Sequence, residues 1–160
     1  MFTGKLLAIG ITPTGSQPME ARQQVAAITG QGLEGDRYAT GQGTFQKGPA
    51  QPLEQVTLIE QEALQAAARD YSITITHLDT RRNLLTENVP LNHLVGKAFC
   101  IGEVILCGIE LCEPCGHLEN LTYPQIKQSL LHRGGLRAEV VQGGQLQVGD
   151  VIRPPAAEQA

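Results

Sequence analysis

The sequence contains no tryptophan, and aromatic residues supply only 4% of its 160 positions. Charged residues are also few, at 18%, and the 16 acidic residues outnumber the 12 basic ones, which gives a net charge of −4. An acidic chain without a long basic run is not typical of a general nucleic-acid-binding protein. Long hydrophobic runs are missing as well, because the apolar run at 6–11 is too short for a membrane span or a signal-peptide core. We therefore expect a soluble, cytoplasmic protein that binds neither nucleic acid nor membrane.

A length of 160 residues is that of one ordinary domain. We place this domain at residues 1–153 and expect residues 154–160 to form a disordered tail. Apolar residues make up 41% of the chain, which is enough to bury a sizeable core. Four cysteines are too few for a disulfide-stapled mini-domain, so we expect free thiols that serve chemistry or a metal.

Short β-prone runs bounded by Gly, Pro, Asn or Asp recur along the chain. They lie at 5–11, 25–28, 56–59, 98–101, 104–111, 136–141, 145–148 and 151–153. This pattern predicts a mainly β domain with two or more short helices, built as a closed or partly open β-barrel. The pair Gly143-Gly144 lies between two of the runs and predicts a tight hairpin.

Two helices are predicted among the strands. The first is indicated by residues that share one helical face, Leu64, Ala67, Ala68 and Tyr71. The second is predicted over 123–133, where Thr122 and Gln125 have the spacing of a capping box. Gly134-Gly135 would end it.

The segment 39–55 is rich in Gly, Gln and Pro and lacks any periodicity. Aperiodic loops of that length in compact domains are usually functional or mobile. We therefore expect it to cover a binding pocket bordered by the residues that precede it.

A cluster of possible metal ligands lies within eleven residues: Cys107, Cys112, Cys115 and His117. A zinc site needs four nitrogen or sulfur ligands, and no second C-x-x-C or H-x-x-x-H is present to complete a standard one. The spacing also matches the opening of a plant-type iron–sulfur motif, but no further cysteine follows. A thioredoxin-like pair would sit in a βαβ unit, which is not predicted here. Zinc, iron–sulfur and thiol redox chemistry stay open at this point.

Strand alternation separates the four cysteines. In the run 104–111, Cys107 shares a face with Ile105 and Ile109, which predicts a buried structural thiol. Cys100 has the same interpretation. Cys115 lies in a turn, where a thiol can be exposed near free backbone N–H groups that favour the thiolate. It is the best candidate for a reactive or metal-binding cysteine.

Several segments, taken in order, resemble a known family. They are Gly35-Asp36-Arg37, Thr80 to Thr86, Leu94 to Gly102, Leu111 to Cys115, Arg133 to Ala138 and Val148-Gly149-Asp150. Together they resemble a stand-alone MOSC domain, the module also found at the C-terminus of molybdenum-cofactor sulfurases. The sequence shows no aminotransferase-like sulfurase segment, so we expect that it does not itself release sulfur from free cysteine.

The resemblance implies a β-barrel-like fold and a bound molybdenum cofactor (molybdopterin). It assigns Cys115 as the catalytic residue and the molybdenum ligand, or as the carrier of sulfur. The residues implied in cofactor binding are Gly35, Asp36, Arg37, Arg81, Arg82 and Asn83, and we add Arg137 as a further candidate. If segment 80–86 is extended, Arg82 points away from Arg81 and Asn83. The resemblance favours Arg82 as the main partner of the cofactor's phosphate, which a guanidinium binds with two parallel hydrogen bonds.

We therefore predict a cofactor-binding protein that passes sulfur or cofactor onward, or that reduces an N-oxygenated small molecule at a cysteine-ligated molybdenum. Its partners would be proteins of cofactor biosynthesis or sulfuration, or that small substrate. One alternative is a non-enzymatic carrier that delivers sulfur or cofactor to a partner protein. The other is a structural domain that binds zinc or iron. The sequence leaves the choice between enzyme and carrier open.

Overall fold

The structure is a computed structural model that describes residues 1–157, so residues 158–160 of the predicted tail lie outside the described residues. Its strands are β1 (Gly4–Ile11), β2 (Glu20–Arg22), β3 (Gln24–Ile28), β4 (Gly32–Leu33), β5 (Val56–Glu60), β6 (Leu84–Glu87), β7 (Ala98–Ile101), β8 (Val104–Leu111), β9 (Leu136–Gln142), β10 (Gly144–Gln147) and β11 (Val151–Arg153). Its α-helices are α1 (Gln61–Tyr71), α2 (Gly116–Leu121) and α3 (Ile126–Ser129). Short 3-10 turns lie at Leu78–Thr80 and Leu91–Leu94. The chain is therefore mainly β, as the sequence predicts.

Within the described residues, seven strands close a barrel in the order β11-β7-β8-β9-β5-β6-β1, and β1 pairs again with β11. Strand β2 adds to β1, and a separate small sheet has the order β10-β3-β4. The pairs are antiparallel except β5–β6, which are joined by α1 and run parallel. A parallel pair requires such a crossover. Closure leaves few free strand edges.

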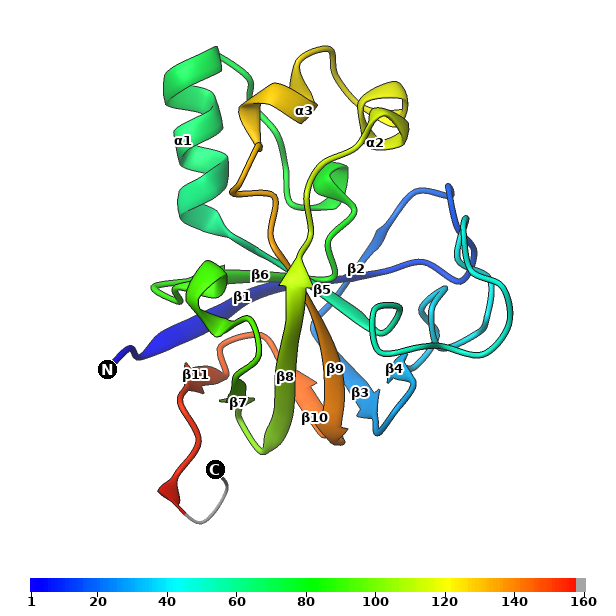
Figure 1. The fold of residues 1–160 in the computed structure, drawn as a ribbon, viewed down its shortest axis with the longest axis vertical. Coiled ribbons are helices and arrows are strands. Elements are labelled where there is room, and N and C mark those ends of the chain that lie inside the picture. Colours follow the sequence, from blue (N-terminus) through cyan, green and yellow to red (C-terminus); the bar gives the residue numbers. More distant parts are fainter. Residues whose placement is uncertain (158–160) are drawn as a thin grey trace.

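The barrel interior is filled by fully buried aliphatic side chains and one phenylalanine. Members of this core include Leu6, Leu58, Phe99, Leu106 and Ile152. A second cluster packs the helices against the outside of β5 and β6, and it includes Ile59, Leu64, Leu118, Ile126 and Leu130. Figure 1 shows the three helices grouped at one end of the barrel. In the described part of the chain, no helix has the length and apolar character needed to span a bilayer.

Helix α1 confirms the first predicted helix. Its buried residues are Ala63, Leu64 and Ala67, which lie on the predicted face. It ends at Ser72, whose left-handed backbone (φ 56°) donates its N–H to the Ala68 carbonyl. Ala68 itself is exposed and Ala63 is buried, so the buried stripe is rotated slightly from the one that the sequence pattern suggests.

The second predicted helix, over 123–133, is wrong. The chain instead forms two shorter helices, α2 and α3, and Thr122 lies at the end of the first, where its hydroxyl donates to the Leu118 carbonyl at 2.6 Å. Gln125 has a left-handed backbone (φ 71°) and cannot lie inside a helix. Pro124 disfavours the helical region for Tyr123, the residue before it, so α2 does not continue through 123.

The predicted hairpin at Gly143-Gly144 is also wrong. Strand β10 pairs with β3 and not with β9. The glycines let the chain cross closely over β3: a Cβ at Gly143 would overlap the Ala27 carbonyl, and the Gly143 N–H donates to the Thr29 hydroxyl at 2.9 Å. The glycine pair therefore marks a change of sheet.

Gly135 offers a test of the packing that starts β9. It has a left-handed backbone (φ 115°), and a Cβ there would overlap the Leu58 carbonyl of β5. Gly30 also has positive φ (71°) but no neighbour within 4 Å of a Cβ. We expect Gly30→Ala to cost about 1–2 kcal/mol of conformational strain. Gly135→Ala should cost about 2–5 kcal/mol, because overpacking adds to that strain. Urea unfolding of both variants measures the difference, and equal losses would contradict it.

Candidate functional site

A cleft of about 520 Å³ lies between the barrel, the loop 39–55 and α2. Of the described residues that line it, four are arginines and two are cysteines: Arg37, Arg81, Arg82, Arg137, Cys112 and Cys115. The structure thus brings together five of the predicted site residues. Gly35, Asp36 and Asn83 do not line the cleft. The loop 39–55 contributes several lining residues, so it borders the cleft as expected.

The cleft carries positive charge in a chain that is negative overall. Against its four arginines, the described lining residues include the carboxylates Glu54 and Glu110. Burial, and then repulsion from Arg37, lower the pKa of Arg81. Burial acts in the same direction on Arg137, but nearby Cys112 and Tyr38 raise its pKa overall. A cleft with this charge is suited to an anionic ligand.

Of the chain's four cysteines, all within the described residues, Cys115 alone is exposed. It lies immediately before α2, at the end of the loop 112–115 that leaves β8. Cys112 is buried but also lines the cleft. Cys100 is buried, as predicted.

Cys107 is half-buried, so the prediction of a buried thiol is wrong. Strand parity is correct, but its face of β8 points outward, while the fully buried Leu106 points into the barrel. Burial, with a smaller effect of Glu139, raises the pKa of the Cys107 thiol. Its outward position separates it from the cleft.

The side chain of Arg82 holds the cysteine loop in place. Its Nε donates to the Gly134 carbonyl at 2.8 Å, and its Nη2 donates to the Cys112 carbonyl at 2.8 Å. Nη1 donates to the Thr80 carbonyl at 3.2 Å. Three of the five guanidinium donors thus bind backbone carbonyls. A role of Arg82 as a phosphate partner stays a prediction, but its bonds show a positioning role.

Asn83 is fully buried and ties three segments together. Its Oδ1 accepts from the Thr57 N–H at 3.0 Å and from the Thr57 hydroxyl at 3.1 Å. Its Nδ2 donates to the Gly10 carbonyl at 3.1 Å. The expectation that Arg81 and Asn83 share a strand face fails, because Arg81 has a left-handed backbone (φ 61°) and β6 begins only at Leu84.

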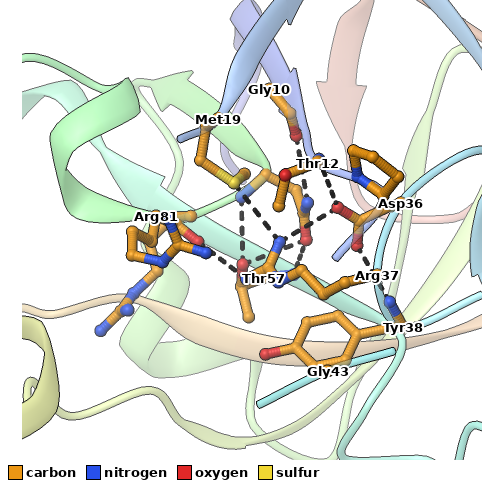
Figure 2. A network of polar contacts seen from close by, with 12 residues as sticks. Gly10, Thr12, Met19, Asp36, Arg37, Tyr38, Gly43, Thr57 and Arg81 are labelled. Atoms are coloured by element: carbon orange, nitrogen blue, oxygen red, sulfur yellow. Dashed lines mark hydrogen bonds and ion pairs between the residues drawn. The ribbon is translucent and has the colours of Figure 1, made fainter. Parts of the chain in front are cut away.

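Asp36 and Arg37 form a buried ion pair beside the cleft (Figure 2). The Asp36 carboxylate lies 3.1 Å from Arg37 Nη1 and accepts from the Thr12 N–H at 3.1 Å. Arg37 Nη2 donates to the Arg81 carbonyl at 3.0 Å, and the guanidinium stacks over the Tyr38 ring at 4.4 Å. Arg37 therefore borders the cleft directly. Asp36 orients it from below.

Sequence reasoning did not assign several lining residues to the site, among them Tyr38, Phe45, Thr57 and Glu110, and it named His117 only as a possible metal ligand. His117 carried a usable signal, since it follows Cys115 by two positions in a cluster of chemically active residues. Phe45 carried another, because an aromatic residue in an aperiodic segment is unusual in a chain with so few aromatics. The other three gave no signal, because they come from separate strands and loops.

The described residues hold no group of three or more His, Cys, Asp or Glu side chains placed to bind a metal ion. The zinc and iron–sulfur alternatives both require such a group. Among the described residues they therefore lack a ligand set, and Cys115 is left as a single thiol beside a cationic cleft.

A comparison with protein families matches the MOSC domain over residues 42–153. The chain belongs to the MOSC domain family. The match includes the cysteine loop and three of the four cleft arginines. Residues 1–41 lie before it and contribute β1 to the barrel.

Solved structures share the fold of this MOSC domain. The YuaD protein from Bacillus subtilis is 18% identical with a TM-score of 0.78, over 95% of this chain and 97% of that one. YiiM from Geobacillus stearothermophilus is 11% identical with a TM-score of 0.70, over 96% and 75%. YiiM from Escherichia coli is 17% identical with a TM-score of 0.65, over 95% and 70%. The comparison with curated proteins gives no match. At these identities the structural similarity shows the fold alone.

The buried ion pair of the MOSC domain can be tested by removing its negative charge. Asp36→Asn should cost about 3–5 kcal/mol of stability, because Arg37 is then a buried charge without its partner. Glu20 and Arg22 form an exposed pair at 2.9 Å, which serves as the control. Glu20→Gln should change stability by less than about 1 kcal/mol. Urea denaturation measures the stability of both variants. A loss in Asp36→Asn as small as that in Glu20→Gln would show that the buried pair is dispensable.

His77 gives the MOSC domain a defined pH dependence. It is 8% exposed, and among the described residues its Nε2 has no hydrogen-bond partner. Burial lowers its pKa below the ordinary value of 6.5, against a weaker opposing effect of the Arg82 and Asn83 backbone. Below about pH 6.5 the unfolded chain therefore binds more protons at His77 than the folded one.

We thus expect this residue to reduce stability as the pH falls from about 7.5 to about 5.5. In His77→Gln that contribution should disappear, so the variant should lose less stability than the wild-type protein over the same range. Urea midpoints at the two pH values measure it. Parallel losses in both proteins would show that His77 does not titrate differently on folding.

Proposed function

We propose that this MOSC domain binds the molybdenum cofactor in the cleft, with Cys115 as the protein's ligand to molybdenum. The observation that carries the proposal is the exposed Cys115 thiol in the same cleft as four arginines. A thiolate is a soft ligand that suits molybdenum, and a guanidinium suits the cofactor's phosphate. The cleft volume of about 520 Å³ falls in the range usual for small-molecule sites. The donor set and the space thus both fit the group.

When bound, the cofactor supplies redox chemistry at molybdenum that the side chains lack. The residues of the chain would hold and orient it. Arg81 and Arg137 are the best-placed phosphate partners. Both are only partly buried, and among the described residues the guanidinium of each donates one hydrogen bond to a backbone carbonyl, so other N–H groups stay available for a ligand. Arg82 would act indirectly, by fixing the loop that carries Cys115.

In this role the cleft residues would hold the cofactor, whose redox chemistry would reduce a small N-oxygenated compound with two electrons from a separate donor. The protein would work in the cytoplasm, where four free cysteines stay reduced. The second candidate is a non-enzymatic carrier that passes sulfur or cofactor to a partner protein. The exposure of Cys115 supports this candidate, because a carrier must present its cargo to a partner.

The decisive test replaces the proposed ligand. Protein produced in a host that makes the cofactor should contain about one molybdenum and one pterin per chain. Cys115→Ser should lose the metal, because a hydroxyl is a poor ligand for it. Cys107→Ser, which changes a thiol outside the cleft, should keep it. Metal and pterin analysis of the three proteins checks this, and full molybdenum in Cys115→Ser would exclude the assignment.

A series of arginine variants separates binding from positioning. Arg81→Lys and Arg137→Lys should weaken cofactor affinity by roughly ten- to a hundredfold, because lysine keeps the charge but not the two-pronged geometry. Arg82→Lys should mainly lower the urea midpoint. If none of the three changes affinity, the arginines do not bind a phosphate. A wild-type protein that binds neither metal nor pterin but accepts sulfur on Cys115 would favour the carrier.

A further inference from the structure

The mouth of the cleft is crossed by contacts between three segments that are distant in sequence. Phe45 from the loop 39–55 and His117 from α2 both line the cleft. Their rings meet edge to face, with centroids 5.4 Å apart and planes at 75°. Ser16, in the turn after β1, joins both sides: its hydroxyl lies 2.8 Å from the Thr44 hydroxyl and 3.2 Å from His117 Nε2.

The part of the loop that carries Thr44 and Phe45 is a compact turn. The Gln46 N–H donates to the Gly43 carbonyl at 3.1 Å, and the Gly43 N–H donates to Gln46 Oε1 at 2.9 Å. These bonds are internal to the turn and do not depend on the contacts across the cleft. We call residues 42–47 the lid. Three further bonds tie it to its surroundings: the Gly15 N–H donates to the Gln42 carbonyl at 2.7 Å, the Gln42 N–H donates to the Arg37 carbonyl at 2.8 Å, and Gln46 Nε2 donates to the Tyr38 carbonyl at 3.0 Å.

Two glycines flank the lid. Gly41 and Gly48 both have positive φ, 76° and 111°, which glycine adopts at little cost. They lie opposite each other at its base, since a Cβ at Gly41 would be 3.7 Å from the Gly48 carbonyl oxygen. Neither position is sterically confined. Hinges of lid motions are a few such residues that absorb a change of backbone angles.

The contacts that Thr44 and Phe45 make at the tip of the lid lie at the surface. Phe45 is 74% exposed, and the Ser16–Thr44 bond lies at the surface. Exposed hydrogen bonds are exchanged for bonds to water at little net cost. The same is not true beneath the cleft, where the Asp36–Arg37 pair and Asn83 are buried. The tip of the lid at Thr44 and Phe45 is therefore held more weakly than the buried groups beneath the cleft, and opening would also exchange the Gly15–Gln42 and Gln46–Tyr38 bonds for bonds to water.

We propose that residues 42–47 are a hinged lid, latched by Ser16, Phe45 and His117, and that the latch selects by size which molecules reach Cys115. Phe45 and His117 line the same cleft as Cys115, and His117 follows Cys115 by two residues. The inference rests on the proposed function only in taking Cys115 as the reacting centre. It holds whether Cys115 carries a metal or sulfur.

The test compares two alkylating reagents that share one reactive group. Iodoacetamide is small, and the same group attached to fluorescein is bulky. Rates at Cys115 and at Cys107 are read separately by peptide mass spectrometry, and Cys107 outside the cleft serves as the internal reference. Phe45→Ala and His117→Ala should raise the rate of the bulky reagent at Cys115 by about three- to tenfold, since each removes one aromatic contact. The iodoacetamide rate and both Cys107 rates should stay unchanged.

Matched variants exclude a general loosening of the fold. Phe45→Tyr keeps the ring and should keep the wild-type ratio of the two rates. Val141→Ala truncates an exposed apolar residue that does not line the cleft and should also keep it. Urea midpoints of all variants should match that of the wild-type protein.

A second readout uses no thiol chemistry. Lys47 is exposed and lies in the lid, whereas Arg69 is exposed in α1. Tryptic cleavage after Lys47 should be faster in Phe45→Ala than in the wild-type protein, and cleavage after Arg69 should be unchanged. Wild-type rate ratios and wild-type cleavage in both alanine variants would overturn the proposal. The reagents need no cofactor, so a failure of the molybdenum assay would leave this test intact.

Discussion

The position of Cys115 depends on the buried guanidinium of Arg82. This side chain bonds the carbonyls of Thr80, Cys112 and Gly134, and so links the segment before β6 to the two segments that follow β8 and precede β9. Among the described residues its recorded bonds go to carbonyls and not to a carboxylate. Its positive charge is thus not neutralised by a partner, and it adds to the field of the cleft. One residue therefore fixes the cysteine loop and favours negative charge beside it.

Glycine and arginine work together at this point. The Cys112 N–H donates to the Gly135 carbonyl at 2.7 Å, and Gly134 packs so closely on Pro114 that a Cβ would lie 2.8 Å from its side chain. The loop 112–115 is thus held by backbone on one side and by Arg82 on another. A reacting group must be held within about 0.5 Å of its working position. A surface loop can meet that demand only with such support.

Sequence patterns predicted the barrel because strand length, alternation and turn residues are local properties. The run 104–111, for example, forms β8 with the predicted bounds. These patterns failed where a distant contact decides the outcome. Gly143-Gly144 looks like a hairpin locally, yet contact with Ala27 and Thr29 makes it a crossing between sheets. The alternation expected along 80–86 failed in a similar way, because Arg81 has a positive φ and β6 begins only at Leu84. The predicted cleft arginines and Cys115 do converge, but which arginine faces a ligand is fixed by bonds between segments 30 to 52 residues apart.

The distribution of burial divides the site into a rigid floor and a mobile rim. On the floor, opening would expose a paired charge and the buried amide of Asn83, which costs several kcal/mol. At the rim, Phe45 and Ser16 lose contacts that water replaces. Local opening follows the smallest free energy, so the rim opens long before the floor does. A site of this kind can admit a large ligand without disturbing the groups that hold it, because the two tasks are assigned to residues with different burial.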